Sequence, residues 1–532
     1  MSIRKLTKAS TAVIAVAVLG VTGCAGGQGV QADPTPQQEV SKGGAIVVAM
    51  SGAPDTLDAT FTSSKHATYI LPNFCEALYS INADLEIIPQ LASDLPTISD
   101  DGLTYSIKLG DGIKFNDGTD FDATAVKISL DRAKTNPLST RASGLKAISE
   151  VKVVDPSTIE LTLSSPNAPL TSVLANREGM ILSPAQLEKL GDDFGTDPVC
   201  VGPFSFDSRP SADRIELKKS EFYYDKDKVS LDAVTFVTIT QPNVRSTNLL
   251  SGDVDVANDV GSSDVAKLKS SSNVDVTQVT SLGYQLITIN VANSNGAGKP
   301  PYELVDAPMA NPDIRKAFEL SLDRDAINEV VYGGFKVPGC SPISPSSPFF
   351  TKVECTKQNI EEAKKIIAAS GLATPIPVTL TVKASDDEHA KLGTVIQAMA
   401  EKVGFNITLK PSESTTGGNA AIAGDFDIYM NGWSGRVDPA QNIDVFWAPT
   451  SALNYSGVDD KELNKVLDEA AVTSDFDTRK SLYKTAAERM LEDRNYIIMF
   501  HDQLILGSGK NVSGIEYYGD GVVRMKTAGF IN

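Results

Sequence analysis

The chain has 532 residues, of which 41% are hydrophobic, 22% charged and 7% aromatic, and its formal net charge is −19. A chain of this composition and length forms a globular protein of several domains, which excludes a mostly disordered chain or a coiled coil. The strong negative charge argues against nucleic-acid binding. None of the three histidines, His66, His389 and His501, lies at metal-ligand spacing from another, so we predict no metal site.

The first segment has the pattern of a bacterial secretion signal. Basic residues at Arg4, Lys5 and Lys8 precede a short apolar stretch, residues 11–22, which is too short for a comfortable membrane span. The stretch ends in Val-Thr-Gly-Cys, with the cysteine at Cys24. This string is similar to a lipobox, the motif whose cysteine is acylated before the signal is cleaved.

We therefore predict a signal peptide over 1–23 and a lipid anchor on Cys24, which would hold an extracytoplasmic protein at a membrane, either on the periplasmic side or at the cell surface. Residues 24–43, rich in Gly, Gln and Pro, are expected to form a flexible tether. The alternative is a plain signal peptide that happens to end near a cysteine.

The body of the chain shows both secondary-structure periods. Apolar and polar residues alternate over 103–109 and 159–163, which indicates half-buried strands. Apolar residues recur with helical spacing over 360–367 and 463–471, and residues 311–331 are typical of two consecutive helices. The mixture predicts an α/β fold.

Four cysteines follow Cys24, and an even number in an exported chain favours disulfides. Three pairings are possible. We expect Cys340 to pair with Cys355, because they bracket a Pro- and Ser-rich loop that needs bracing, and this leaves Cys75 for Cys200. Buried free thiols are the alternative.

Long segments in a fixed order carry a family resemblance. The segment 91–133, LASDLPTISDDGLTYSIKLGDGIKFNDGTDFDATAVKISLDRA, resembles the signature of the family 5 solute-binding proteins, the peptide- and nickel-type extracellular receptors of ABC importers. Other segments that match the family follow in its order: 201–206, 214–224, 249–257, 313–334, 361–372, 424–433 and 454–470. The resemblance covers nearly the whole chain after the signal.

The resemblance implies a two-lobed periplasmic-binding-protein fold of the large, three-subdomain type, with a hinge and a central ligand cleft. The chain would cross between the lobes near 281–285 and near 496–501. The expected parts are lobe I (44–78, 195–284 and 498–532), a subdomain inserted in lobe I (79–194), and lobe II (285–497).

The same resemblance implies a monomeric receptor, without a cofactor, that captures peptides or peptide-like solutes. It would deliver them to a membrane permease whose ATPase subunits are separate chains. The alternative on the same fold is a receptor for a non-peptide anionic solute, such as an opine-like compound or an acidic sugar conjugate. Nickel chelates are disfavoured because the chain has so few histidines.

A secreted hydrolase is the remote alternative. The segment Gly432-Trp433-Ser434-Gly435-Arg436 superficially suggests a nucleophile elbow, but Arg436 stands where the G-x-S-x-G motif requires glycine. The chain also has no phosphate-binding loop. We therefore predict a binding protein with no catalytic residues.

The resemblance places the loop after the GDFDI strand in the cleft, which here is Trp433-Ser434-Gly435-Arg436 followed by Asp438. Peptide-binding relatives usually carry an aspartate three residues after the tryptophan, where it pairs with the peptide amino terminus. This chain has Arg436 at that spacing, and Asp438 is a possible substitute acid. Trp433 is either a stacking wall for the solute or part of the core.

Further segments match cleft-facing stretches of the family, with surface or capping roles as the alternative for each. The candidate residues in these segments are Ser63, Ser64, Lys65, Arg141, Asn258, Asp259 and His501. Lys65, Arg141 and Arg436 would converge on one cleft of a strongly acidic protein. Because arginine holds carboxylates through paired hydrogen bonds, we predict that Arg436 binds an anionic group of the solute. The competing account is that Asp438 or Asp259 neutralises these cations.

Overall fold

The structure is a computed structural model that describes residues 40–384 and 387–531. The predicted signal peptide, the predicted lipidation site Cys24 and most of the predicted tether lie outside these residues. Within the described part of the chain, no helix is both long and apolar enough to cross a membrane.

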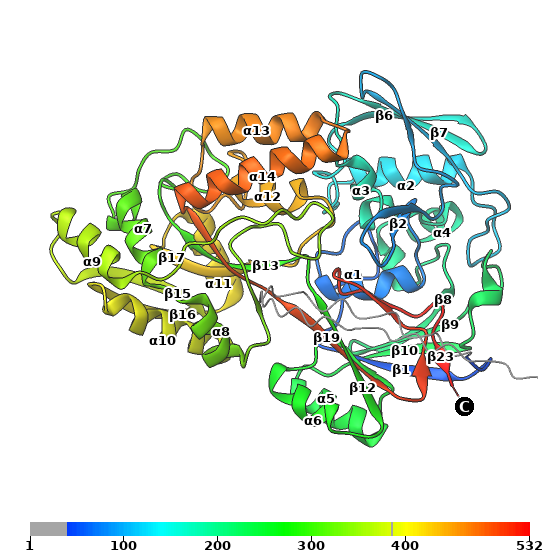
Figure 1. Ribbon diagram of the computed structural model, residues 1–532. Coiled ribbons are helices and arrows are strands. Elements are labelled where there is room, and N and C mark those ends of the chain that lie inside the picture. The colour runs from blue at the N-terminus through cyan, green and yellow to red at the C-terminus, as the bar shows by residue number, and fades with distance from the viewer. Residues whose placement is uncertain (1–39, 385–386, 532) are drawn as a thin grey trace, which may run out of the picture. The chain divides into compact units, whose positions relative to one another are not determined.

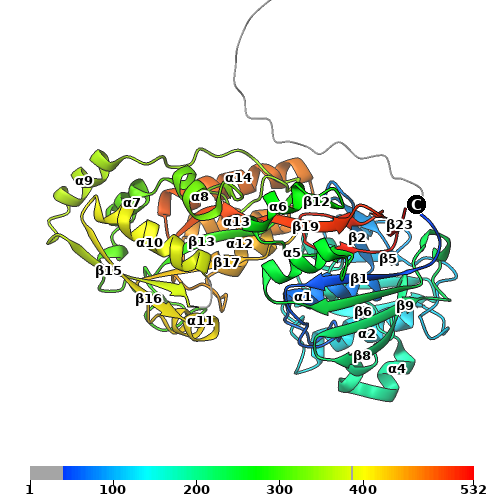
Figure 2. The ribbon, with the colours of Figure 1, turned by 90° about the horizontal axis from the view of Figure 1, so that it is seen from below.

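A seven-stranded mixed sheet organises one part of the chain. Its strands, in spatial order, are β12 (Val274–Thr280), β19 (Gln503–Gly509), β11 (Val256–Ala257), β1 (Ala45–Met50), β10 (Ala233–Thr238), β9 (Arg214–Lys219) and β8 (Phe204–Ser211). The central strand β1 is nearly continuous in apolar residues and pairs in parallel with β10 and β11, as expected of a strand buried on both faces. Helices α5 (Pro242–Ser251) and α6 (Val265–Lys269) pack beside β19 and β12 (Figures 1 and 2).

A six-stranded mixed sheet organises the second part. Its spatial order is β14 (Val337–Pro338), β18 (Tyr496–His501), β13 (Tyr284–Ile289), β17 (Ile428–Trp433), β15 (Ile376–Lys383) and β16 (Phe405–Ser412). Eight helices occur in the described residues between β13 and β18: α7 (Pro312–Ser321), α8 (Arg324–Tyr332), α9 (Ile360–Ala369), α10 (Asp387–Glu401), α11 (Ser414–Ala423), α12 (Ala440–Trp447), α13 (Lys461–Val472) and α14 (Phe476–Asp493). Helix α10 packs on β15 and β16, and α13 lies beside α14 (Figure 1).

Between β1 and β8 the chain forms smaller elements. A four-stranded antiparallel sheet has the order β4 (Thr97–Ile98), β5 (Thr104–Lys108), β7 (Thr158–Leu163) and β6 (Ile148–Asp155), and β2 (Tyr79–Ile81) pairs with β3 (Ile87–Pro89). The helices of this region are α1 (Lys65–Ile70), α2 (Ala123–Thr135), α3 (Leu170–Val173) and α4 (Pro184–Leu190). Helix α2 packs against β6 and β7.

Short elements complete the described chain. The C-terminal segment forms two strand pairs, β20 (Val512–Ser513) with β23 (Gly529–Phe530) and β21 (Glu516–Tyr517) with β22 (Val523–Arg524). The 3₁₀ turns are η1 (Leu71–Asn73), η2 (Arg177–Gly179), η3 (Gly191–Thr196), η4 (Lys226–Lys228), η5 (Ser262–Asp264) and η6 (Pro308–Ala310).

The elements predicted from periodicity are confirmed. The alternating segments form β5 and β7, and the helical segments form α7, α8, α9 and α13. Helix α7 begins where the sequence suggests, because the side chain of Asn311 accepts a hydrogen bond from the amide of Asp313 and thereby caps the helix.

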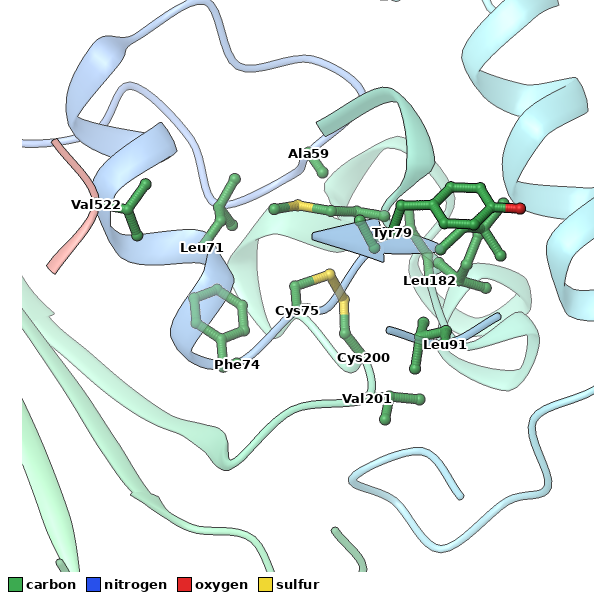
Figure 3. Packing of buried hydrophobic residues seen from close by; sticks show 14 of the residues in the cluster. Ala59, Leu71, Phe74, Cys75, Tyr79, Leu91, Leu182, Cys200, Val201 and Val522 are labelled. Carbon is green, nitrogen blue, oxygen red and sulfur yellow. A yellow bond between two sulfur atoms is a disulfide. The ribbon is translucent and has the colours of Figure 1, made fainter. Parts of the chain in front are cut away.

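Both predicted disulfides are present. Cys75 pairs with Cys200 across 125 residues of sequence, within a buried cluster that includes Leu71, Phe74 and Val201 (Figure 3). Cys340 pairs with Cys355 and closes the Pro- and Ser-rich loop. The alternative of buried free thiols is therefore wrong.

The chain passes twice between the two large sheets. The first crossing is residues 281–283, between β12 and β13, as the sequence suggests. The second is Asp502, because β18 ends at His501 and β19 begins at Gln503. Residues 498–501 were expected in lobe I, but they belong to β18, which pairs with β13 in the six-stranded sheet. The other expected lobe boundaries stay predictions.

Candidate solute-binding site

A large cavity of about 1400 Å³ contains most of the predicted site residues. Its wall is formed by α1 and neighbouring residues, by the turns around Arg141 and Arg177, by the loop after β17, and by the C-terminal strand pairs. The predicted residues that line it are Ser63, Lys65, Arg141, Trp433, Ser434, Gly435 and Arg436. The cavity thus touches segments on both sides of the two chain crossings.

The loop after β17 is held in shape by Asn442, at the start of α12. Its side-chain oxygen accepts hydrogen bonds from the indole nitrogen of Trp433, at 3.1 Å, and from the amide of Arg436, at 2.6 Å. Its amide nitrogen donates to the carbonyl of Arg436 at 2.7 Å. One buried side chain therefore fixes both ends of the predicted ligand loop.

Two glycines let this loop pack directly on the first crossing. A Cβ at Gly435, whose φ is +77°, would lie 2.2 Å from the carbonyl carbon of Leu282, and a Cβ at Gly283 would lie 2.2 Å from the carbonyl oxygen of Trp433. Neither contact leaves room for a side chain. The cavity wall and the crossing are therefore in direct backbone contact.

Trp433 belongs partly to the core and partly to the cavity wall. Its ring packs edge-on against Phe446 with centroids 6.0 Å apart, so one side belongs to the core. The guanidinium of Arg436 lies over the ring at 5.1 Å, and both residues line the cavity. This cation–π contact holds the arginine at the cavity wall.

Lys65 begins α1, which Ser64 caps by accepting a hydrogen bond from the amide of His66. The Lys65 ammonium lies 3.8 Å from the Asp259 carboxylate, so this cation has an acidic partner. Ser63 donates to Asp55 at 3.1 Å. Ser64 is therefore a helix cap and is not among the residues that line the cavity.

Arg141 is buried and fully engaged with protein groups. Its guanidinium pairs with Glu178 at 3.1 Å and donates to the carbonyl of Thr62 at 3.1 Å and to the hydroxyl of Thr140. The sequence places it correctly at the cavity, but its charge is already balanced by Glu178.

Arg177 was missed by sequence reasoning, although it lines the cavity and only 4% of its surface is exposed. It donates to the carbonyls of Thr62 and Ser64, at 3.1 and 3.4 Å, and its Nε has no hydrogen-bond partner. Burial, together with the nearby charges of Arg141 and Arg436, lowers its pKa to about 9. The only signal in the sequence is a cation in the turn at 176–179.

Asp444, on α12, was also missed. It lines the cavity, and burial and the nearby Asp438 raise the pKa of its carboxyl to about 7, although Lys146 across the cavity opposes this shift. Within the described residues, no cation lies at ion-pair distance from its carboxylate, in contrast to the acids that pair with Lys65 and Arg141.

Asn258 and Asp259 lie behind the cavity wall. Asn258 is fully buried and accepts hydrogen bonds from the amide of Asp259 and from the hydroxyl of Tyr517. Asp259 accepts a hydrogen bond from Ser51, and although burial alone would raise its pKa, Lys65 and this hydrogen bond lower it. Both residues support the wall without lining it.

Asp438 and His501 also lie outside the cavity lining. Asp438 is 3% exposed, pairs with Arg479 at 3.0 Å and caps the amide of Ala440, so the structure uses it as an internal counter-ion and not as a substitute ligand acid. His501 is buried, with Nδ1 2.8 Å from the carbonyl of Gly283, and burial lowers its pKa. This contact joins the two crossings to each other.

No group of three or more His, Cys, Asp or Glu side chains among the described residues is arranged to hold a metal ion.

Comparison with known proteins agrees with this geometry. The family described as "Bacterial extracellular solute-binding proteins, family 5 Middle" matches residues 86–454, more than half of the chain. The glutathione-binding protein GsiB of Shigella dysenteriae is 26% identical over 481 residues, which cover 88% of this chain and 91% of its own.

Solved structures share the fold. The ABC transporter substrate-binding protein CtaP of Listeria monocytogenes superposes with a TM-score of 0.81 at 22% identity, covering 92% of this chain and 100% of its own. DppA of Helicobacter pylori, in complex with the peptide STSA, has a TM-score of 0.78 at 22% identity and covers 92% and 99%. The chain therefore belongs to family 5 of the bacterial extracellular solute-binding proteins, which are receptors of ABC importers and not enzymes.

Proposed function

We propose that this receptor captures a small peptide or a peptide-like solute in the 1400 Å³ cavity and delivers it to a membrane permease served by separate ATPase subunits. The cavity carries the proposal, because it exceeds the range of about 300–1000 Å³ that is usual for small-molecule sites and so has room for a peptide. The relative GsiB is named for binding glutathione, a peptide, and DppA was solved with a peptide bound.

The two crossings give the proposed receptor its hinge. The chain passes between the sheets only through residues 281–283 and through Asp502 in the described structure, and short links of this kind permit rigid-body closure. A solute that contacts Arg436 on one side and Lys65 or Arg141 on the other would favour the closed form. The proposed moving parts are the lobe I, inserted-subdomain and lobe II ranges given above, with residues 498–501 moved to lobe II.

Binding of defined peptides to the purified protein tests the proposal. Calorimetry with glutathione and with unmodified di- and tripeptides should show saturable binding with one solute per protein and no turnover. Bound solute should also raise the melting temperature through mass action and make the particle more compact in X-ray scattering. If none of these peptides binds, or if scattering is unchanged at saturation, the proposed peptide capture or the proposed closure is wrong.

The proposed anchor is a lipid on Cys24, which would keep a monomeric receptor next to its permease. The mature protein should partition into detergent and should run as a monomer in sedimentation. The Cys24→Ala protein should be released or left unprocessed. A freely soluble mature protein that begins beyond residue 24 would contradict the anchor and leave the proposed solute capture intact.

A receptor for a non-peptide anionic solute is the second candidate. The observation that favours it is Arg436, which stands in the ligand loop where peptide-binding relatives usually carry an aspartate. Native mass spectrometry of the protein as purified would separate the two candidates by the identity of any solute that is carried along.

A further inference from the structure

Eight cationic side chains of the described residues line the cavity, and four of them, Lys65, Arg141, Arg177 and Arg436, differ in whether an acid of the protein lies at ion-pair distance. Lys65 lies near Asp259, and Arg141 pairs with Glu178. Arg177 and Arg436 have no carboxylate at ion-pair distance in the described part of the chain. These two guanidinium groups of the cavity wall therefore lack a carboxylate of their own, although Glu178, which pairs with Arg141, lies near enough to attract both.

Arg177 is the more constrained of the two. Only 4% of its surface is exposed, and its Nε has no hydrogen-bond partner. The hydrogen bonds that it does make go to neutral backbone carbonyls. A buried cation without a counter-ion at ion-pair distance is costly, because its lost hydration is not replaced by an opposite charge. An anion in the cavity would supply the missing charge.

Arg436 reaches the same cavity from the other side of the crossings. Its guanidinium donates to the hydroxyl of Ser434 at 3.1 Å and to the carbonyl of Gly435, both of which are neutral groups of its own loop. The aromatic face of Trp433 and the backbone held by Asn442 fix its position. The charge of Arg436 is near enough to Arg177 to disfavour protonation of that side chain.

We propose that Arg177 and Arg436 together form an anion-binding subsite, which takes a carboxylate or a phosphate of the solute between the two sides of the cavity. The inference rests on the proposed capture of a solute in this cavity. The planar guanidinium groups can each donate two hydrogen bonds to such an anion. Because the two arginines come from different sides of the crossings, the bound anion also opposes their repulsion and holds the two sides together.

This assignment changes the cation cluster expected from the sequence. The sequence suggested Lys65, Arg141 and Arg436, but Lys65 and Arg141 already have acidic partners. Of the two suggested neutralising acids, Asp438 is committed to Arg479, and Asp259 lies near Lys65 and is not at ion-pair distance from Arg177 or Arg436. The residue that completes the subsite is Arg177, and specificity for an anionic solute comes from the Arg177–Arg436 pair.

The test uses succinate and inorganic phosphate as separate probes of the purified protein, each compared with chloride at equal ionic strength. The variants are Arg177→Gln, Arg177→Lys and Arg436→Gln. The matched control is Arg209→Gln, because Arg209 also donates to backbone carbonyls, those of Pro54 and Ala212, but does not line the cavity. Melting temperature and calorimetric affinity are measured for every protein.

We expect at least one of the two probes to raise the melting temperature of the unaltered protein beyond the effect of chloride. Each Gln variant should lose at least about tenfold in affinity for that probe, as expected when one partner of a buried charge pair is removed. The Lys variant should keep part of the affinity, since it keeps the charge and loses the planar fork. The control should bind as the unaltered protein does.

The inference is overturned if neither probe stabilises the protein more than chloride does, or if both Gln variants bind the probe with unaltered affinity. Should Arg177→Gln fail to fold, Arg436→Gln and Arg177→Lys decide the matter by the same criteria. A response to succinate alone assigns a carboxylate to the subsite, and a response to phosphate alone assigns a phosphate.

The two proposals fail in different ways. If peptides bind equally to the unaltered protein and to both Gln variants, peptide capture stands and the anion subsite is wrong. If no peptide binds but the anion response is lost in the Gln variants, the subsite stands and peptide capture is wrong.

Discussion

Arginine side chains are buried in two regions of this molecule, and a carboxylate of the protein pairs with them in one region but not in the other. Beside the six-stranded sheet, Glu319 accepts hydrogen bonds from Arg324 and Arg494, both at 2.8 Å, and from Thr356 at 2.9 Å. In the cavity, Arg177 is buried to a similar degree but has no acidic partner among the described residues. In the first region the protein itself supplies the carboxylate that balances the arginines. In the second region the charge of Arg177 is available to an anionic group of a solute.

Arg479, which pairs with Asp438, shows the same contrast with Arg177. Arg479 is 5% exposed and donates to Asp438 and Tyr483, and although burial alone would lower its pKa, Asp438 raises it. The pKa of Arg177 is instead lowered to about 9, by burial and by neighbouring cations. The difference teaches that the acidic neighbour, and not burial, distinguishes a structural arginine from one that can bind a ligand.

Removing the shared acid of the complete network should have the largest effect. Glu319→Gln leaves the buried Arg324 and the half-buried Arg494 without a counter-charge, and it should lower the free energy of unfolding by about 3–5 kcal/mol. Urea denaturation followed by circular dichroism measures the loss. The control is Glu362→Gln, whose surface pair with Lys316 should contribute less than about 1 kcal/mol. Equal losses for the two variants would contradict the distinction between these environments.

Asp438→Asn tests whether this acid is structural. It removes the single carboxylate partner of Arg479 and should lower the free energy of unfolding by about 3 kcal/mol, while affinity for the solute is unchanged at temperatures where the variant is folded. Denaturation and calorimetry on the same sample measure both quantities. A variant of unaltered stability that no longer binds solute would restore Asp438 as the ligand acid suggested by the sequence.

We predict that the free energy of unfolding depends on pH through Asp444, which lines the cavity. Its pKa in the folded protein, about 7, lies above the ordinary aspartate value of 3.8. The folded state therefore binds more protons than the unfolded state between these values, and the stability contributed by this group falls as the pH rises from about 4 to 7. Asp444→Asn should therefore be more stable than the unaltered protein at pH 8. The expected gain is about 1–2 kcal/mol and not the full value of the shift in pKa, because the side chain is only half-buried and solvent screens its charge. The two proteins should be equal near pH 4.

Thermal unfolding of both proteins at a series of pH values, without solute, measures this difference. Burial also lowers the pKa of His66 and His501, which makes stability rise with pH through the histidine range, but this contribution is common to both proteins and cancels. A constant difference from pH 4 to pH 8 would show that Asp444 has an ordinary pKa.

The smallest effect is expected for Arg177→Met in the absence of solute. The variant loses two hydrogen bonds to backbone carbonyls, but it also removes an uncompensated charge that repels Arg436. These effects oppose each other, so the free energy of unfolding should change by less than about 1 kcal/mol. A loss as large as that of Glu319→Gln would mean that Arg177 is a structural arginine, and the comparison between the two regions would fail.

Local features of this protein were predictable from the sequence. Period-two and helical patterns located β5, β7, α7, α8, α9 and α13, because one face of each element is buried and the pattern records that face. The pairing of Cys340 with Cys355 followed from the loop between them. The order of long motifs identified the family, which the comparison with known proteins confirms.

The division of charge in the cavity could be decided only by the tertiary structure. The sequence shows Arg436 and Asp438 two positions apart and suggests that they are alternatives, but Asp438 turns inward to Arg479, which is 41 residues away. Arg177 has no local pattern that marks it as a binding residue, and its guanidinium is held at the cavity by a hydrogen bond to the carbonyl of Thr62, 115 residues away in the chain. Sequence patterns record which face of an element is buried, whereas ion pairing depends on which distant side chains meet there, and only the folded chain determines that.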